Sequence, residues 1–295
     1  MYRIKEFLSE WLIPPAVYRC IKKIKRKTAA GLYGTGSGMN FTENEKFRNI
    51  HNGRRCFILA TGPSVKDQDL SGLSDEICIA VSHFHLHPDI RKIAPAYHVL
   101  APQHSPFTFE DSRRYFDDFI KYYSGSDVIY FLGLFDYEYS YSELLKKYPE
   151  YRLENTYFLN YASSVRLTEE NYIDDDLWNI AGNPFAIRTV IYSAVQLAVY
   201  MGFNEIYLLG CDHNYLDDIS TSGGVHFYPD EAGIPDKEQQ AGCTTERLLK
   251  EYYERWKDYR FIKQYAVAKR VKIYNATKGG MLDVFDRIEL ADVLV

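Results

Sequence analysis

A turn with the sequence Thr61-Gly62-Pro63-Ser64 follows a short apolar run, and its residue types suit a phosphorylated ligand. The apolar run, residues 56–60, has the length and the strand formers of a buried central strand. Glycine lets the backbone approach a ligand closely, and serine is a candidate N-cap for the next segment of the chain. Backbone N–H groups at such a strand end attract anions. The turn therefore predicts a phosphate site, with an ordinary strand-to-loop turn as the alternative.

A second set of reactive side chains, in Gly210-Cys211-Asp212-His213, follows the apolar run at residues 205–209. Asp212 and His213 would supply an acid–base pair, and His226 in the following glycine-flanked loop is a candidate base of near-neutral pKa. The alternative is that Asp212 caps the next turn and that His213 is a buried, hydrogen-bonded side chain. In a parallel sheet this strand end and the Thr61–Ser64 turn would lie on the same edge.

Metal-binding patterns are weak in this sequence. His83, His85 and His87 alternate, so on an extended segment they would share one face and could ligate a metal. Asp217-Asp218 could likewise hold a metal–diphosphate. No acidic or cysteine partner lies at a suitable spacing from the histidines, and a lone acidic pair is a weak signal. We therefore predict no metal and no cofactor, and favour a solvated or nucleotide-facing loop for the histidines.

The elements that must position these residues read as an α/β fold. Apolar runs recur about every twenty residues with polar stretches between them, which predicts a Rossmann-like, open, mostly parallel sheet flanked by helices. Further strands are predicted at residues 77–82, 96–101, 127–133 and 271–274. A helix is predicted over residues 186–201, with Asn183 and Pro184 at its start and Gly202 at its end, and another begins near Thr245.

Composition narrows the function classes. The chain has 295 residues, 46% of them hydrophobic and 25% charged, which is typical of a globular protein. A net charge of −5 gives no reason to expect nucleic acid as a partner. Five cysteines without CxxC spacing fit a reduced, cytoplasmic protein. The 26 tyrosines and 17 phenylalanines are enough to line a site for ring-shaped ligands.

Two regions differ from the rest. Residues 1–45 read as an amphipathic basic segment with a linker, and residues 46–295 as the catalytic domain. Within the first, residues 7–27 combine Trp, Leu and Phe with a basic cluster, which predicts binding to an anionic membrane surface on its inner face. The alternative is a helix packed on its own domain or on a second subunit of a homo-oligomer. Residues 134–180 are rich in tyrosine and weakly periodic, so we expect a lid insertion over the carboxyl edge of the sheet.

The order of these motifs resembles a known family. Residues 60–73, the strand end at Ser82-His83, the helix leading into residues 201–215 and a later loop histidine together resemble the bacterial sialyltransferases of glycosyltransferase family 42. They also resemble relatives in surface-polysaccharide clusters that are grouped with hydroxymethylpterin diphosphokinases. The resemblance implies a GT-A-like variant of the Rossmann fold that uses a CMP-activated nonulosonic acid without a divalent metal.

The resemblance also implies roles for individual residues. The turn at Thr61, Gly62, Pro63 and Ser64 would contact the nucleotide phosphate and ribose, and His226 would be the general base on the acceptor hydroxyl. The other nucleotide-binding positions would be Ser82, Thr189, Asn214 and Tyr215.

Three functions are compatible with this pattern. The first is a glycosyltransferase that transfers a sugar from a nucleotide-sugar donor to a glycan or lipid-linked acceptor in lipopolysaccharide or capsule synthesis. The second is a Mg²⁺-dependent diphosphokinase of the hydroxymethylpterin type, for which Asp212, Asp217 and Asp218 would have to bind the metal. The third is a nucleotide-binding scaffold without turnover.

Overall fold

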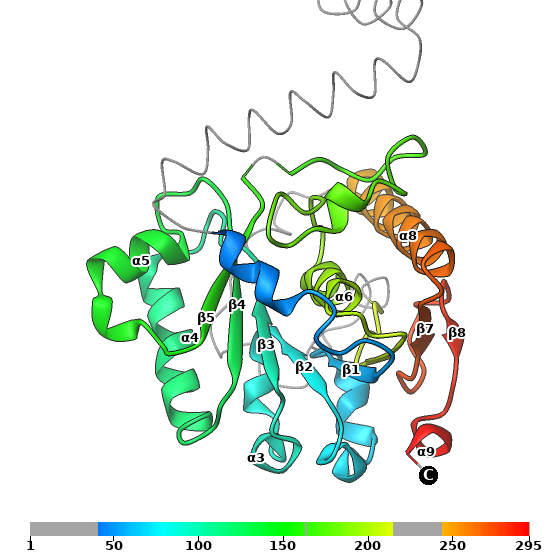
Figure 1. The fold of residues 1–295 in the computed structure, drawn as a ribbon, viewed down its shortest axis with the longest axis horizontal. Coiled ribbons are helices and arrows are strands. Elements are labelled where there is room, and N and C mark those ends of the chain that lie inside the picture. Colours follow the sequence, from blue (N-terminus) through cyan, green and yellow to red (C-terminus); the bar gives the residue numbers. More distant parts are fainter. Residues whose placement is uncertain (1–40, 163, 215–243, 295) are drawn as a thin grey trace, which may run out of the picture.

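A computed structural model describes residues 41–294 apart from residues 163 and 215–243, and within them the strands form one all-parallel sheet (Figure 1). The sheet has eight strands in the order β5-β4-β3-β2-β1-β6-β7-β8. They are β1 (Arg55–Leu59), β2 (Cys78–Val81), β3 (Tyr97–Leu100), β4 (Ile129–Leu134), β5 (Thr156–Asn160), β6 (Glu205–Leu209), β7 (Lys272–Asn275) and β8 (Asp286–Arg287). The predicted Rossmann-like class is confirmed, and the sheet is parallel throughout.

The order of the strands reverses beside β1. The chain adds β2 to β5 on one side of β1 and then crosses to add β6 to β8 on the other side. Leu59 of β1 pairs with Ala80 of β2 and with Leu209 of β6, so three strands end at the same level. In open α/β sheets ligands bind outside the carboxyl ends of the strands at such a switch point. The fold therefore predicts a ligand site among the segments that follow β2, β1 and β6.

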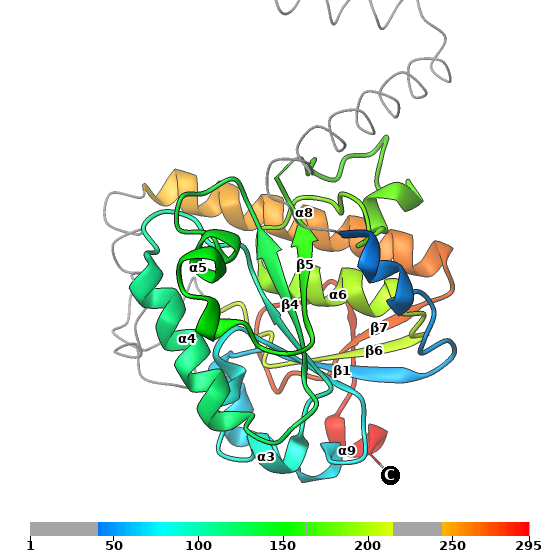
Figure 2. The same cartoon turned by 60° about the vertical axis from the view of Figure 1, so that its left-hand side comes forward.

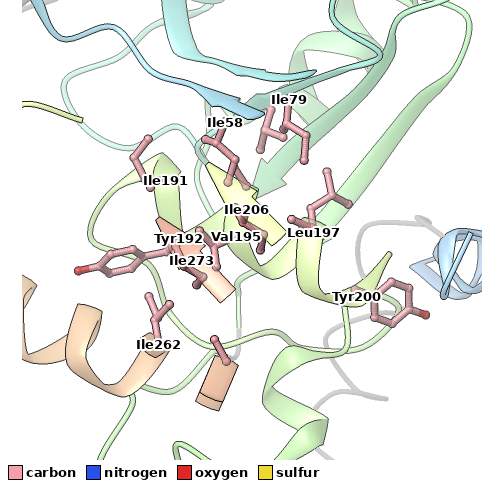
Figure 3. Close-up of a cluster of buried hydrophobic side chains, with 14 of the residues drawn as sticks. Ile58, Ile79, Ile191, Tyr192, Val195, Leu197, Tyr200, Ile206, Ile262 and Ile273 are labelled. Atoms are coloured by element: carbon pink, nitrogen blue, oxygen red, sulfur yellow. The ribbon is translucent and has the colours of Figure 1, made fainter. Parts of the chain in front are cut away.

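Helices cover both faces of the sheet (Figure 2). α6 (Val190–Tyr200) and α8 (Thr245–Ala268) pack on one face, where Ile58, Ile79 and Ile206 point from the strands (Figure 3). The alternate residues of the strands, such as Phe57 and Leu59, face the other side. That side is covered by α3 (Ile90–Ile93), α4 (Phe109–Tyr122), α5 (Tyr141–Lys147) and α9 (Leu290–Val293). This alternation creates two apolar cores that hold the sheet rigid.

Short 3₁₀ helices complete the described chain. They are η1 (Phe41–Phe47), η2 (Pro63–Asp67), η3 (Ser71–Leu73), η4 (Ser82–Leu86), η5 (Pro149–Tyr151) and η6 (Asp175–Trp178). η1 is anchored to the domain because buried Asn44 donates to the carbonyls of Phe158 and Ile180, at 2.8 and 2.9 Å. The packed chain thus already includes residues 41–45, which the sequence had suggested as linker. Residues 7–27 lie outside the described residues, and among those described no helix is long and apolar enough to cross a membrane.

The expected lid at residues 134–180 is wrong for its first half. β5 lies inside this stretch and extends the sheet, pairing Phe158 with Leu132 of β4 and burying Leu159. Its aromatic sequence lacks a clean alternation because it forms the edge of the sheet, where burial is uneven. The second half follows the carboxyl end of β5 and is packed against α8, with Trp178 stacked 3.9 Å from Tyr265 between ring centroids.

The start of the central helix also differs from the prediction. α6 begins at Val190, with Thr189 as its N-cap, instead of at residue 186 after Asn183 and Pro184. Before the cap, the N–H of Ala186 donates to the carbonyl of Val165 at 2.8 Å, which draws this part of the chain away from the helix. Thr189 accepts a hydrogen bond from the N–H of Ile191 at 3.4 Å. The predicted placement of Thr189 at a helix start is confirmed.

Candidate functional site

Asp212 joins the two strand ends at the switch point. The N–H of Ser64 donates to its Oδ1 at 3.2 Å, and the Ser64 hydroxyl donates to its Oδ2 at 2.8 Å. The N–H of Gly62 donates to the Gly210 carbonyl at 2.9 Å, which continues the pairing of β1 with β6. Asp212 is only 5% exposed. We call Gly62, Ser64, Gly210 and Asp212 the switch-point cluster.

Two of its members must be glycine. A Cβ on Gly62 would lie 1.9 Å from Oδ2 of Asp212 and 2.5 Å from the carbonyl oxygen of Gly210. Gly210 has φ of +67°, and a Cβ there would lie 2.5 Å from the carbonyl oxygen of Ala60. Only glycine combines that backbone conformation with such close approach. The glycines that the sequence singled out therefore serve the contact between the two strand ends.

A third segment, after β7, supports Asp212 from the opposite side. The N–H of Met281 donates to the Asp212 carbonyl at 2.7 Å, and Gly280 packs against the Asp212 backbone. Arg287 of β8 donates to the carbonyls of Gly279 and Gly280, which holds this loop closed. The sequence reasoning missed this support, although the Gly279-Gly280 pair was a visible signal for a tight backbone approach.

The electrostatics of Asp212 suit a hydroxyl partner. Burial raises the pKa of this carboxyl above 3.8, while the hydrogen bonds from Ser64 and the charge of Arg287 oppose the shift. A buried carboxylate accepts hydrogen bonds strongly and repels a neighbouring phosphate. The geometry also corrects the expectation of a backbone phosphate cradle. The N–H groups of Gly62 and Ser64 are already donated within the cluster, and Pro63 has none.

His213 contacts α8 and is not hydrogen-bonded to the switch-point cluster in the described structure. Its φ is +53°, and its Nε2 lies 2.7 Å from the hydroxyl of Tyr259 on α8. Burial, with a smaller contribution from the charge of Arg255, lowers the pKa of His213 from 6.5 to about 3. The role in an acid–base pair that was expected of His213 is therefore wrong, because a desolvated imidazole holds a proton poorly. The alternative of a buried, hydrogen-bonded side chain describes it.

This burial predicts a specific pH dependence of stability. His213 takes up a proton in the unfolded chain near pH 6.5 but not in the folded chain until about pH 3, so acid favours unfolding. Lowering the pH from 7 to 5 should cost about 2 kcal/mol of unfolding free energy through this group. Urea unfolding at both pH values should show that the unfolding free energy falls by about 2 kcal/mol less in His213→Gln than in the parent. Equal losses in the two proteins would contradict the burial of a neutral histidine.

A basic group lies beside the N-terminus of α6. Arg188 donates to Asp258 at 2.9 Å and to Glu254 at 3.3 Å, so its charge is compensated by α8. Arg166, which follows β5, donates to the Ile187 carbonyl at 3.1 Å. Burial and the nearby charge of Arg188 lower the pKa of Arg166. A helix N-terminus with a guanidinium beside it attracts phosphate or carboxylate groups. The sequence reasoning missed Arg166, which had no recognisable motif.

The histidines after β2 do not form the expected extended face. Residues 82–86 form η4, in which His83 lies 2.9 Å from the hydroxyl of Tyr115 through its Nδ1. Nε2 of His85 lies 3.5 Å from Asp118, so this histidine also faces α4. Among the described residues, no group of three or more histidine, cysteine, aspartate or glutamate side chains is arranged to hold a metal ion.

The remaining predicted residues are placed only in part. Ser82 and Thr61 follow β2 and β1 at neighbouring positions on the carboxyl edge of the sheet. Asn214 is partly buried beyond His213, and its Oδ1 receives no hydrogen bond from the part of the chain that is described. Tyr215, Asp217, Asp218 and His226 lie outside the described residues.

No family model and no curated protein matches this chain. Among solved structures it is similar to the sialyltransferase CST-II in complex with a trisaccharide acceptor and CMP, at 12% identity and a TM-score of 0.45. The match covers 80% of this chain and 86% of that one.

Proposed function

We propose that this chain is a glycosyltransferase that uses a nucleotide-sugar donor. The observation that carries the proposal is the position of Asp212, a buried carboxylate at the point where the strand order reverses, between two glycine strand ends. Nucleotides bind open α/β sheets at this point. The sequence resemblance of the same segments to family 42 sialyltransferases narrows the donor to a CMP-activated nonulosonic acid.

The charges around the switch point divide the donor between two subsites. Asp212 would accept a hydrogen bond from a ribose or sugar hydroxyl, because its charge repels phosphate and favours a hydroxyl donor. The N-terminus of α6 at Thr189, together with Arg166, would hold the phosphate. Ser82, at the end of β2, would lie on the ribose side. Asn214 and Tyr215 would approach the phosphate, as the resemblance implies.

The transfer step would proceed by displacement at the anomeric carbon. The acceptor hydroxyl oxygen forms a bond to that carbon as the bond to the phosphate oxygen breaks, and the nucleoside monophosphate leaves with the bonding electron pair. The proton of the acceptor hydroxyl passes to His226, which is the base implied by the family resemblance. The helix N-terminus and Arg166 stabilise the charge that develops on the leaving phosphate. This assignment requires no step at His213.

Arg166 should contribute to donor affinity and little to folding. Arg166→Met is expected to weaken CMP binding about tenfold, because the phosphate loses a charge-assisted hydrogen bond. The unfolding free energy should change by less than about 0.5 kcal/mol, since this residue is exposed and forms no ion pair with another described residue. Calorimetric titration of CMP into both proteins measures the effect. The matched control is Arg114→Met on α4, a residue 58% exposed in its side chain, which should bind CMP as the parent does.

The acceptor and the cellular site form part of the same proposal. A glycan or lipid-linked acceptor in surface-polysaccharide synthesis would be reached if residues 7–27 bind the anionic inner surface of the membrane. A vesicle sedimentation assay would compare the full chain with one in which the six basic residues of this stretch, Arg19, Lys22, Lys23, Lys25, Arg26 and Lys27, are replaced with glutamine. Loss of binding to anionic vesicles in the variant alone supports the peripheral membrane role, and equal sedimentation opposes it.

The direct test of the activity is a transfer assay in EDTA. The full chain, a CMP-activated nonulosonic acid and a panel of glycans and glycolipids are incubated together, and released CMP and extended glycan are quantified. Formation of both in equal amounts, with loss of turnover but retained CMP binding in His226→Ala, is the expected result. Transfer that persists in His226→Ala would contradict the assigned base, and CMP binding without any extended product would favour a scaffold.

A further inference from the structure

Ser82 adopts a backbone conformation that serine rarely occupies. Its φ is +49°, in the left-handed region, and it lies immediately after β2 on the carboxyl edge of the sheet. This geometry carries a conformational energy cost for any residue other than glycine, and it persists only where neighbouring groups enforce it. Strained residues of this kind are frequent at ligand sites, where a neighbouring group holds them in place.

That group is the imidazole of His98 on β3. Nε2 of His98 lies 2.8 Å from the carbonyl oxygen of Ser82, and Nδ1 lies 2.7 Å from the hydroxyl of Tyr123. A carbonyl can only accept, so Nε2 carries the proton and donates it, and Nδ1 of the neutral ring accepts from Tyr123. The two hydrogen bonds together fix both the tautomer and the orientation of the ring.

The surroundings make this arrangement rigid. His98 is 0% exposed and packs against Phe119 of α4, with ring centroids 4.6 Å apart. Tyr123 caps the C-terminus of α4, so its hydroxyl is held by the helix. Burial lowers the pKa of His98 well below 6.5, which keeps the ring neutral over the physiological pH range. The residue after Ser82, His83, is tied to the same helix through Tyr115, with ring centroids 4.2 Å apart.

We propose that His98 is a positioning residue that holds Ser82 in its left-handed conformation, so that Ser82 is presented to the nucleotide at the switch point. The presentation to a nucleotide rests on the proposed function, whereas the relay from Tyr123 through His98 to Ser82 does not. The histidine acts through the backbone of Ser82 and does not touch the ligand. It also explains why a strand in an apolar sheet carries a fully buried histidine.

A double-mutant cycle separates this role from packing. Glycine accepts φ of about +50° without strain, so Ser82→Gly removes the need for the histidine. His98→Leu alone should weaken CMP binding about tenfold, but by less than about twofold when it is made in the Ser82→Gly background. His98→Gln, whose amide can still donate to the Ser82 carbonyl, should bind CMP within about threefold of the parent. Equal losses on His98→Leu in both backgrounds would overturn the proposal, because a packing role is indifferent to the residue at position 82.

The same proteins test the relay if the parent does not bind CMP, an outcome that would remove the proposed function. The midpoint of urea unfolding is then compared across the cycle. A smaller loss of midpoint on His98→Leu in the Ser82→Gly background than in the parent supports the relay, and an equal loss overturns it. The ¹³Cα and ¹³Cβ chemical shifts of Ser82 give an independent readout, since they should move from left-handed toward extended values in His98→Leu and stay unchanged in His98→Gln.

Discussion

Asp212→Asn is expected to reduce sugar transfer about 100-fold, the effect of losing a charge-assisted hydrogen bond worth about 2.7 kcal/mol to the donor. The fold should tolerate the change. The amide oxygen can still accept from the N–H of Ser64, and the amide nitrogen can donate to the Ser64 hydroxyl. Initial rates at saturating acceptor measure the loss of transfer, and urea unfolding measures the stability of the variant.

The stability of this variant is as informative as its rate. Because burial raises the pKa of Asp212, the ionised side chain is less favourable in the folded chain than in water at neutral pH. The protonated side chain contributes to stability below the pKa that Asp212 has in the unfolded chain. This contribution is lost as the pH rises through the higher pKa of the folded chain. The neutral amide should therefore leave the unfolding midpoint at pH 7 unchanged or higher. Asp117→Asn, a change at an exposed position on α4, is the control and should alter neither the transfer rate nor the unfolding midpoint. A transfer rate within about twofold of the parent in Asp212→Asn would remove Asp212 from the site.

Gly62→Ala is expected to disrupt the switch-point cluster, with a loss of about 3 kcal/mol of unfolding free energy and of measurable CMP binding. The added methyl group would lie 1.9 Å from Oδ2 of Asp212 and 2.5 Å from the backbone oxygen of Gly210. One contact is with backbone, so the strain cannot be relieved by turning a side chain. The hydrogen bond between Gly62 and Gly210 must lengthen, and Asp212 must leave Ser64.

A matched glycine shows whether the effect is local. At Gly182 the nearest contact of an added Cβ is 3.5 Å, to Nδ2 of Asn179, which is ordinary packing. Gly182→Ala should therefore change the unfolding free energy by less than about 0.5 kcal/mol and leave CMP binding intact. If Gly62→Ala behaved like Gly182→Ala, the close approach of the two strand ends would be incorrect.

Much of the fold could be predicted from the sequence because its central strands are short apolar runs bounded by breakers. The runs at residues 56–60 and 205–209 match β1 and β6 closely. The edge strand β5 could not be read, because a half-exposed aromatic segment has no clear period. α6 is buried along nearly its whole length, so its apolar pattern extended past the cap at Thr189 into residues that pair with a loop. Periodicity reports burial and does not by itself report where a helix begins.

The candidate site was predictable in its location but not in its chemistry. The turn at Gly62 and the strand end at Asp212 were both recognisable, and their meeting follows from the parallel sheet. Their hydrogen bonds could not be read from residue types, and these bonds use the turn's N–H groups internally. The low pKa of His213 depends on α8, which lies far along the chain. Arg166 and His98 are placed by tertiary contacts alone.

Nucleotide binding at the switch point can be measured directly by thermal unfolding. The full chain and Asp212→Asn are unfolded with CMP, UDP, GDP or ATP, each in EDTA and in Mg²⁺. A ligand at about a hundred times its dissociation constant adds about 2.7 kcal/mol to stability, which shifts the midpoint visibly. We expect CMP to stabilise the parent in EDTA and Asp212→Asn to lose most of this shift. Stabilisation by ATP in Mg²⁺ alone, with no response to CMP, would contradict the proposed donor site and favour a metal-dependent diphosphokinase.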